Sequence, residues 1–181
     1  RRVLFRSFRS GYPQKLGGWL RSTSETFLGV CRQMYGWITS YGDNFVAMGT
    51  SKKVYINTGS QYYDITPLRE TTVAGAVTFG AVTTAPYSTT ITVYDTAANV
   101  DAGDFVTFSG AVSLGGNITA AVLNQEYQVL ASINSGEYTI TAKDPTTGLP
   151  VTSNASDVGS GGAATVGAYQ IPIGYDTTTY G

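Results

Sequence analysis

The stretch that decides the fold is FLGVCRQMYGWITSYGDNFVAMGTSKKVYINTGSQYYDITP, residues 27–67. Four runs in it are typical of β-strands: residues 29–39, 44–50, 53–57 and 61–67. Short segments rich in Ser, Gly and Asp separate the runs, and these residue types close β-hairpins. The stretch therefore predicts four short antiparallel strands, which is the size of one propeller blade.

A single blade cannot cover its own faces, so this stretch predicts neighbours supplied by other sequence or by other subunits. Within it, residues 45–48 are continuously apolar, as expected of a strand buried on both faces. Cys31 is the only cysteine, which excludes an intrachain disulfide, and its apolar context predicts a small buried hydrophobe. Trp19 and Trp37 are expected to anchor the sheet.

After residue 72 the composition shifts to Ala, Gly, Thr and Val, and shorter strands are predicted at 89–94, 104–108, 125–130 and 138–142. Apolar residues spaced two apart share one face of a strand, so they predict the interior of a small open barrel or sandwich. The predicted interior is Ile91, Val93, Val106, Phe108, Tyr127, Val129, Tyr138 and Ile140.

These patterns predict an all-β chain in which a propeller-blade-like antiparallel sheet is interrupted by an inserted small β-barrel or sandwich domain. We assign residues 8–72 plus 166–181 to the blade-like unit and residues 73–165 to the inserted β-barrel domain. Residues 1–7, RRVLFRS, match one reading frame of a common sequencing adapter. We interpret them as an artefact of a gene fragment assembled from environmental reads, and leave them out of the fold prediction.

Charge is distributed unevenly, although the net charge is only −1. Residues 1–72 hold ten of the eleven Lys and Arg residues and four of the twelve acids, whereas residues 73–181 hold one Lys and eight acids. If Arg21, Arg32, Lys52 and Lys53 lined a channel, binding of duplex DNA would weaken steeply with salt. Because the basic residues are scattered, we favour a solvated basic face.

The residue types that carry catalysis are missing from the sequence. It contains no His, no Gly-x-Ser-x-Gly elbow, no phosphate-binding Gly-x-x-x-x-Gly-Lys and only one Cys. We therefore expect no enzyme activity, no catalytic, cofactor-binding or metal-binding residues, and no small-molecule substrate. No apolar run of about 18 residues is present, so we expect no membrane span.

Two binding hypotheses remain as alternatives. Asp95, Asp101 and Asp104 lie close in sequence and could hold Ca²⁺, but the regular calcium-loop spacing is missing and Asp is a common turn residue, which we favour. Several tyrosines could form a carbohydrate- or base-stacking face, but sheet aromatics more often pair across strands. These tyrosines are Tyr12, Tyr35, Tyr41, Tyr55, Tyr62 and Tyr63.

Four segments resemble the opening of virion proteins of tailed phages, particularly short-tailed marine phages. They are GYPQKLGGW (11–19), FLGVCRQMYGW (27–37), FVAMGTSKKVYI (45–56) and YYDITPLR (62–69). The related tail-nozzle proteins, also called packaged-DNA stabilisation proteins, resemble propellers and close the portal channel after DNA packaging. The resemblance implies a virion location, with assembly in the host cytoplasm.

A second resemblance covers TTITVYDTAANVDAGDFVTFSG (89–110), LNQEYQVL (123–130) and YTITAK (138–143). These segments are similar to a small β-barrel insertion common in phage tail and baseplate proteins, and to the first-catalytic-cysteine-half domain of ubiquitin-activating enzymes. Ala97-Ala98-Asn99 departs from the Ala-His-Gly that often precedes the Gly-Asp turn in the phage versions. No ubiquitin chemistry is implied, because residues of an adenylation site are absent.

From these resemblances we expect a structural component of a phage tail or neck, nozzle-like and without catalysis. Its expected partners are copies of itself in a ring and phage portal or tail proteins. The alternative is a receptor- or glycan-binding tail module that uses two loops of the inserted domain, residues 110–117 and 144–162.

Overall fold

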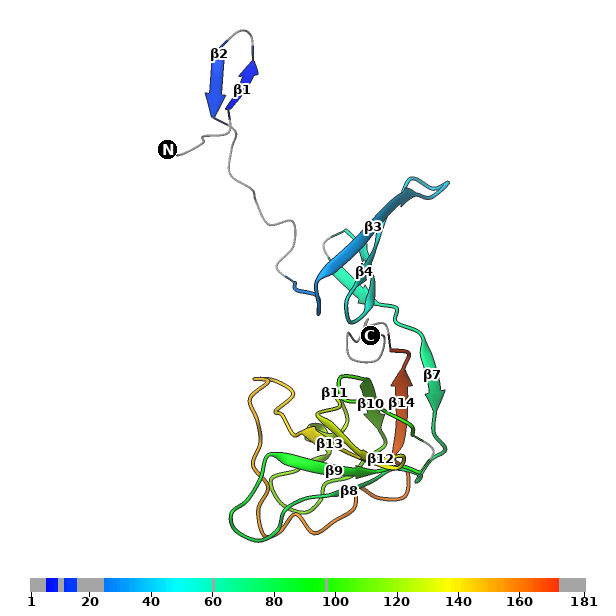
Figure 1. Cartoon of the computed structure of the whole chain (residues 1–181), viewed down its shortest axis with the longest axis vertical. Helices are drawn as coiled ribbons and strands as arrows, with labels where there is room; N and C mark the ends of the chain where they lie inside the picture. Colours follow the sequence, from blue (N-terminus) through cyan, green and yellow to red (C-terminus); the bar gives the residue numbers. More distant parts are fainter. Residues whose placement is uncertain (1–5, 10–11, 16–24, 60, 97, 173–181) are drawn as a thin grey trace, which may run out of the picture.

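The computed structural model describes residues 6–9, 12–15, 25–59, 61–96 and 98–172, and side chains from residue 25 onward. Its sheets are all antiparallel, and the one described helix is a single turn, so the predicted all-β class is confirmed (Figure 1). Before residue 25 the structure contains a hairpin of β1 (Arg6–Arg9) and β2 (Tyr12–Lys15). Arg6 and Ser7 thus take part in a strand, although we had left them out of the fold prediction.

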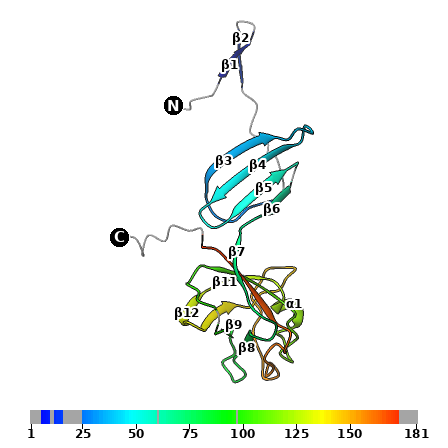
Figure 2. The same cartoon turned by 90° about the vertical axis from the view of Figure 1, so that its right-hand side faces the viewer.

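The deciding stretch forms one four-stranded sheet, called here the first sheet. Its strands are β3 (Cys31–Ile38), β4 (Asn44–Thr50), β5 (Val54–Thr58) and β6 (Gln61–Asp64). They follow one another in space in the order of the sequence, as Figure 2 shows. The four strands predicted between residues 29 and 67 are confirmed, with ends that differ by at most three residues.

The rest of the described chain forms two further four-stranded sheets, called here the sandwich. One sheet has the order β12-β13-β9-β8 and the other the order β11-β10-β14-β7; neither closes on itself as a barrel would. The strands of the former are β8 (Thr78–Gly80), β9 (Thr90–Tyr94), β12 (Ala131–Asn134) and β13 (Glu137–Thr141). Those of the latter are β7 (Leu68–Thr71), β10 (Phe105–Ser109), β11 (Glu126–Gln128) and β14 (Val166–Gln170).

Apolar side chains from both sheets meet in a single core between them. All eight residues predicted to face the interior are buried, so this prediction is confirmed. The ring of Phe79 on β8 packs edge-on against Phe108 on β10, with centroids 5.0 Å apart. Each buried side chain of this size contributes about 1.5–3 kcal/mol. The sandwich therefore has a core of its own.

Two local elements of the sandwich differ from the prediction. A one-turn helix, α1 (Ala120–Leu123), follows Thr119, whose hydroxyl accepts a hydrogen bond from the backbone N–H of Val122 at its N-cap. Strand β12, which contains Ile133 and Asn134 and pairs with β13, lies outside the predicted strands. In both places a Thr, Ser or Asn side chain can hydrogen-bond to the backbone in place of another backbone group. The spacing of apolar residues in the sequence does not show where this happens.

The chain enters and leaves the sandwich at one place. Strand β14 lies beside β7, and the backbone N–H of Ile171 donates to the carbonyl of Pro67 at 2.9 Å. We had grouped residues 68–72 and 166–170 with the first sheet, but β7 and β14 join β10 in a sandwich sheet. The buried core of the sandwich includes Tyr169 of β14, so β14 and its neighbour β7 belong to the sandwich and not to the first sheet.

A buried carboxylate links the two sandwich sheets through tyrosine hydroxyls. The Tyr169 hydroxyl donates to Asp95 Oδ2 at 2.7 Å and lies 2.8 Å from the Tyr138 hydroxyl. Burial raises the pKa of both tyrosines, and their mutual contact adds to this for Tyr169. Both hydroxyls therefore remain protonated, so that Tyr169 donates to the buried carboxylate and Tyr138 can donate to the Tyr169 oxygen.

We expect Tyr169→Phe to lower the free energy of unfolding by about 2 kcal/mol, because it removes a donor from a buried carboxylate. Tyr138→Phe leaves that donor in place and should cost about half as much. Urea unfolding measures both, with the half-exposed Tyr94→Phe as the control. Equal losses for Tyr169→Phe and Tyr94→Phe would contradict the role of the network.

Candidate assembly surface

One face of the first sheet carries apolar side chains on all four strands and is called here the aromatic face. Cross-strand pairing places Tyr35, Ala47, Ile56 and Tyr63 in one row across the sheet, and Trp37 and Phe45 in the next row. Successive residues of a strand point to opposite faces, so these six share one face. None of the six is buried in this chain, and Tyr35 is 68% exposed.

Three rings of the aromatic face lie nearly parallel. Tyr35 and Trp37 have centroids 6.2 Å apart at 25°, and Trp37 and Phe45 have centroids 5.5 Å apart at 17°. This is cross-strand and same-strand aromatic pairing, which stabilises a sheet even without a second layer. It agrees with the prediction that sheet aromatics pair, and with Trp37 as an anchor of the sheet. Trp19 lies outside the described residues.

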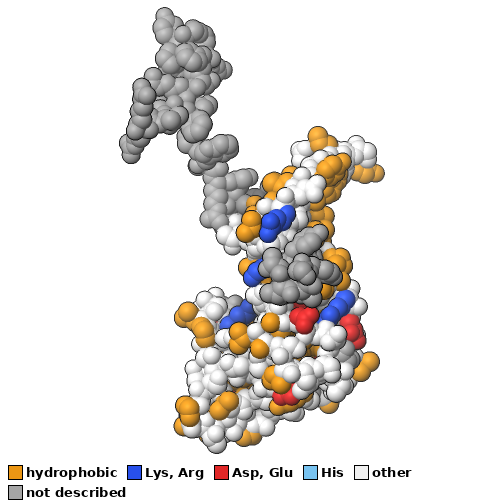
Figure 3. Space-filling model, viewed as in Figure 1, with side chains coloured by type: hydrophobic (Ala, Val, Ile, Leu, Met, Phe, Trp, Pro, Cys, Tyr) orange, Lys and Arg blue, Asp and Glu red, His pale blue; other side chains and the backbone are white. Residues whose placement is uncertain are grey.

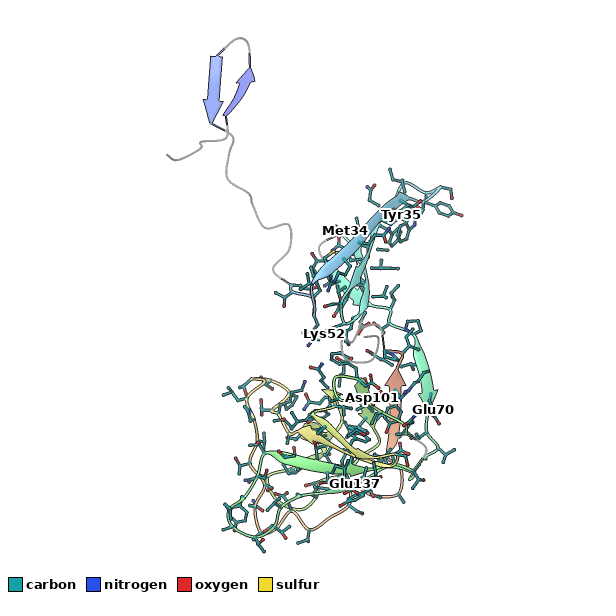
Figure 4. The ribbon with its side chains drawn as sticks, viewed as in Figure 1. Met34, Tyr35, Lys52, Glu70, Asp101 and Glu137 are labelled. Atoms are coloured by element: carbon teal, nitrogen blue, oxygen red, sulfur yellow. The ribbon has the colours of Figure 1, made fainter. Side chains whose placement is uncertain are left out.

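The opposite face of the first sheet carries Met34, Ile38, Val46, Met48 and Tyr55, among others. The segment before β3 covers part of it: the Phe27 ring packs on Tyr55 and Tyr62 at 6.1 and 5.5 Å. Met48 and Tyr55 are buried, whereas Met34 and Ile38 are 60% and 68% exposed. Both faces of the sheet thus present apolar side chains to solvent in this chain (Figure 3; Met34 and Tyr35 are labelled in Figure 4).

Two predictions about burial in the first sheet were wrong. In the run 45–48 only Met48 is buried, and the other three residues are half-buried. Cys31 is half-buried as well, with its thiol 3.7 Å from the carbonyl of Gln33. The apolar run 45–48 predicted that other parts of the protein pack on both faces of the first sheet. Among the described residues, only the segment around Phe27 packs on one of these faces.

Two loops of the sandwich, residues 110–117 and 144–162, are joined through Asp157. Its buried carboxylate accepts hydrogen bonds from the backbone N–H groups of Gly116, Asn117, Ile118 and Asn154, at 2.8 to 3.2 Å. Backbone bonds from Gly159 to Leu114 and from Val112 to Gly161 complete the join. Sequence analysis missed this role of Asp157, since a lone Asp in a Gly- and Ser-rich tract looks like any turn residue.

The three carboxylates weighed as a calcium site have separate partners. Asp95 is buried in the sandwich with Tyr169, whereas Asp104 accepts from the backbone N–H of Asp101 and lies 3.8 Å from Arg69. Burial is the main cause of a raised pKa at Asp104. Within the described residues, no three His, Cys, Asp or Glu side chains are grouped as a metal ion would require.

The basic residues considered for a DNA channel have different environments. Lys53 is 2% exposed and paired with carboxylates, so it neither lines a channel nor belongs to the solvated basic face that we favoured. Arg32 and Lys52 are exposed on the first sheet, and Arg21 lies outside the described residues.

Comparison with known proteins gives no relative: no family model, curated protein or solved structure matches this chain. Over the described residues, no helix reaches the length and apolarity needed to cross a bilayer.

Asp157→Ala should lower the free energy of unfolding by about 2–3 kcal/mol, because four backbone donors lose a shared charged acceptor. Hydrogen exchange should speed up at the amides of Gly116, Ile118 and Asn154. The half-buried Asp144, which accepts from Thr146 and Thr147 in a turn, provides the control Asp144→Ala. Unchanged hydrogen-exchange rates at these three amides in Asp157→Ala would contradict the role of Asp157 in joining the two loops.

Proposed function

We propose that this chain is a structural virion component of a bacteriophage tail or neck, nozzle-like, which assembles through both faces of the first sheet. The observation that carries the proposal is a four-stranded antiparallel sheet with exposed apolar side chains on each face, Tyr35 on one and Ile38 on the other. A meander of this size that requires cover on both faces is typical of a propeller blade.

The resemblance to tail-nozzle proteins supports the same function, because its most specific segments fall on the first sheet and on the segment leading into it. In a ring, the aromatic face of one sheet would pack on the opposite face of the next. The partners are then copies of this chain, together with portal or tail proteins. Stable protein interfaces bury about 800 Å² per partner around a few large apolar anchors, and Tyr35, Trp37 and Ile38 are such residues.

The second candidate is a receptor- or glycan-binding tail module. The observation that favours it is the join at Asp157, which brings together the two loops expected to make the contact and fixes their backbone. Preorganised loops on a rigid scaffold lose little entropy on binding. Leu149 and Val158 of the second loop are exposed apolar side chains that a ligand would cover.

The assembly proposal predicts concentration-dependent association of the purified chain, measured by sedimentation equilibrium. The double substitution Tyr35→Ser with Ile38→Ser removes one exposed anchor from each face and should weaken association by at least tenfold, about 1.4 kcal/mol. The free energy of unfolding should fall by no more than about 1 kcal/mol, because both side chains are exposed and only the Tyr35–Trp37 ring pair is lost.

The matched control is Leu149→Ser with Val158→Ser, which removes two exposed apolar residues from the sandwich and should leave association unchanged. Ring-shaped particles in negative stain, or co-purification with a portal protein, would add support. A wild-type chain that stays monomeric at high concentration and fails to bind portal or tail proteins would overturn the proposal. Binding to a glycan array that is lost in the Leu149 and Val158 variant would favour the second candidate.

A further inference from the structure

Lys53 is a buried cation at the point where the first sheet meets the sandwich. The turn between β4 and β5 fixes its place: the Thr50 hydroxyl accepts from the backbone N–H groups of Lys52 and Lys53 and donates to the Lys53 carbonyl. Lys53 thus lies immediately before β5 with its side chain 2% exposed, whereas its neighbour Lys52 is exposed at the same end of the sheet (Figure 4).

The Lys53 ammonium is bonded to both units of the chain. It donates to Asp64 Oδ2 of β6 at 2.5 Å and to Glu126 Oε2 of β11. The ammonium also lies 4.6 Å from the centre of the Phe105 ring on β10, within the range of a cation–π interaction. One positive charge therefore joins the first sheet to two strands of the sandwich.

Neighbouring polar groups hold the two carboxylates in place. The Thr66 backbone N–H and hydroxyl donate to Asp64 Oδ1 at 2.9 and 2.6 Å, which leaves Oδ2 to face Lys53. Gln170 Nε2 of β14 donates to Glu126 Oε2 at 3.1 Å and lies 3.5 Å from Asp64 Oδ2. The amide must turn its N–H groups to two carboxylates, and its buried Oε1 has no partner among the described residues.

The charge balance makes the junction depend on Lys53. Two carboxylates and one ammonium carry a net charge of −1, so loss of the ammonium would leave two negative charges facing each other at a partly buried site. The other charged groups nearby are the exposed Lys52, 3.5 Å from Gln128 Oε1, and the Arg69–Asp104 pair on β7 and in the turn before β10. Neither contacts the Asp64 or Glu126 carboxylate.

We infer that Lys53 is a charged latch that fixes the orientation of the sandwich on the first sheet. The covalent connection between the first sheet and the sandwich is the three residues between β6 and β7, and beside it the backbone N–H of Ile171 donates to the carbonyl of Pro67. With the latch closed, loops 110–117 and 144–162 project in one direction from the sheet. With it open, the connection between β6 and β7 acts as a hinge.

The pKa directions set the pH range in which the latch is closed. Burial would raise the pKa of Asp64, but hydrogen bonds from Lys53 and Thr66 outweigh it and hold the pKa below its ordinary value. Burial would lower the pKa of Lys53, but the two carboxylates raise it. The contribution of Asp64 is present above about pH 4 and is lost as pH falls through the lowered pKa of Asp64, and the Lys53 contribution is lost only in strong alkali.

The test is a distance measurement between two spin labels in the full chain. Cys31→Ser removes the native thiol, and Asn44→Cys and Ser132→Cys place labels on exposed strand positions of the first sheet and the sandwich. The distance distribution should be narrow and constant from pH 9 to pH 5. Lys53→Met should at least double its width at pH 7.

Lys52→Met is the matched control and should leave the width unchanged, because Lys52 is exposed and bonds no carboxylate. Glu126→Met removes the ion pair across the junction and leaves the ion pair between Lys53 and Asp64 in place, and it should also broaden the distance distribution. This variant replaces Lys53→Met in the test if circular dichroism shows that Lys53→Met does not fold. A narrow distribution in a folded Lys53→Met or Glu126→Met chain would overturn the latch. So would equal broadening by Lys52→Met.

Discussion

A four-stranded sheet has two faces, and the described part of this chain covers only part of one. That constraint accounts for the contrast between the two units. The sandwich buries large side chains between its own sheets, whereas the first sheet leaves Tyr35, Met34 and Ile38 exposed and covers Tyr55 with Phe27. Exposed apolar surface on both sides of one sheet marks protein contacts. The proposed assembly role follows from this imbalance together with the resemblance.

Much of the fold could be predicted because apolar and polar residues alternate along many of its strands. The eight interior residues of the sandwich were identified from two-residue spacing alone, since alternation directly reports which side of a strand is covered. The continuous apolar run 45–48 gave no such information, and its burial was overestimated. Strand grouping was harder, because β7 and β14 pair across about 100 residues and nothing local to either strand specifies that partner.

Polar residues with structural roles were the least predictable. Asp157 and Lys53 have the same sequence signature as surface residues, yet one joins two loops and the other lies buried between two units. Their roles depend on partners more than 35 residues away, Ile118 and Glu126. The candidate assembly surface was partly foreseen, because the blade-sized stretch already implied uncovered faces, whereas the latch had no sequence signal.

The neighbouring entry and exit of the sandwich, where Ile171 bonds to Pro67, have an evolutionary consequence. A unit whose two ends meet can be gained, lost or exchanged for another by recombination without altering the path of the host sheet. Strands β3 to β6 all precede residue 67, so an exchange of the unit between Pro67 and Ile171 would leave every strand of the first sheet unchanged.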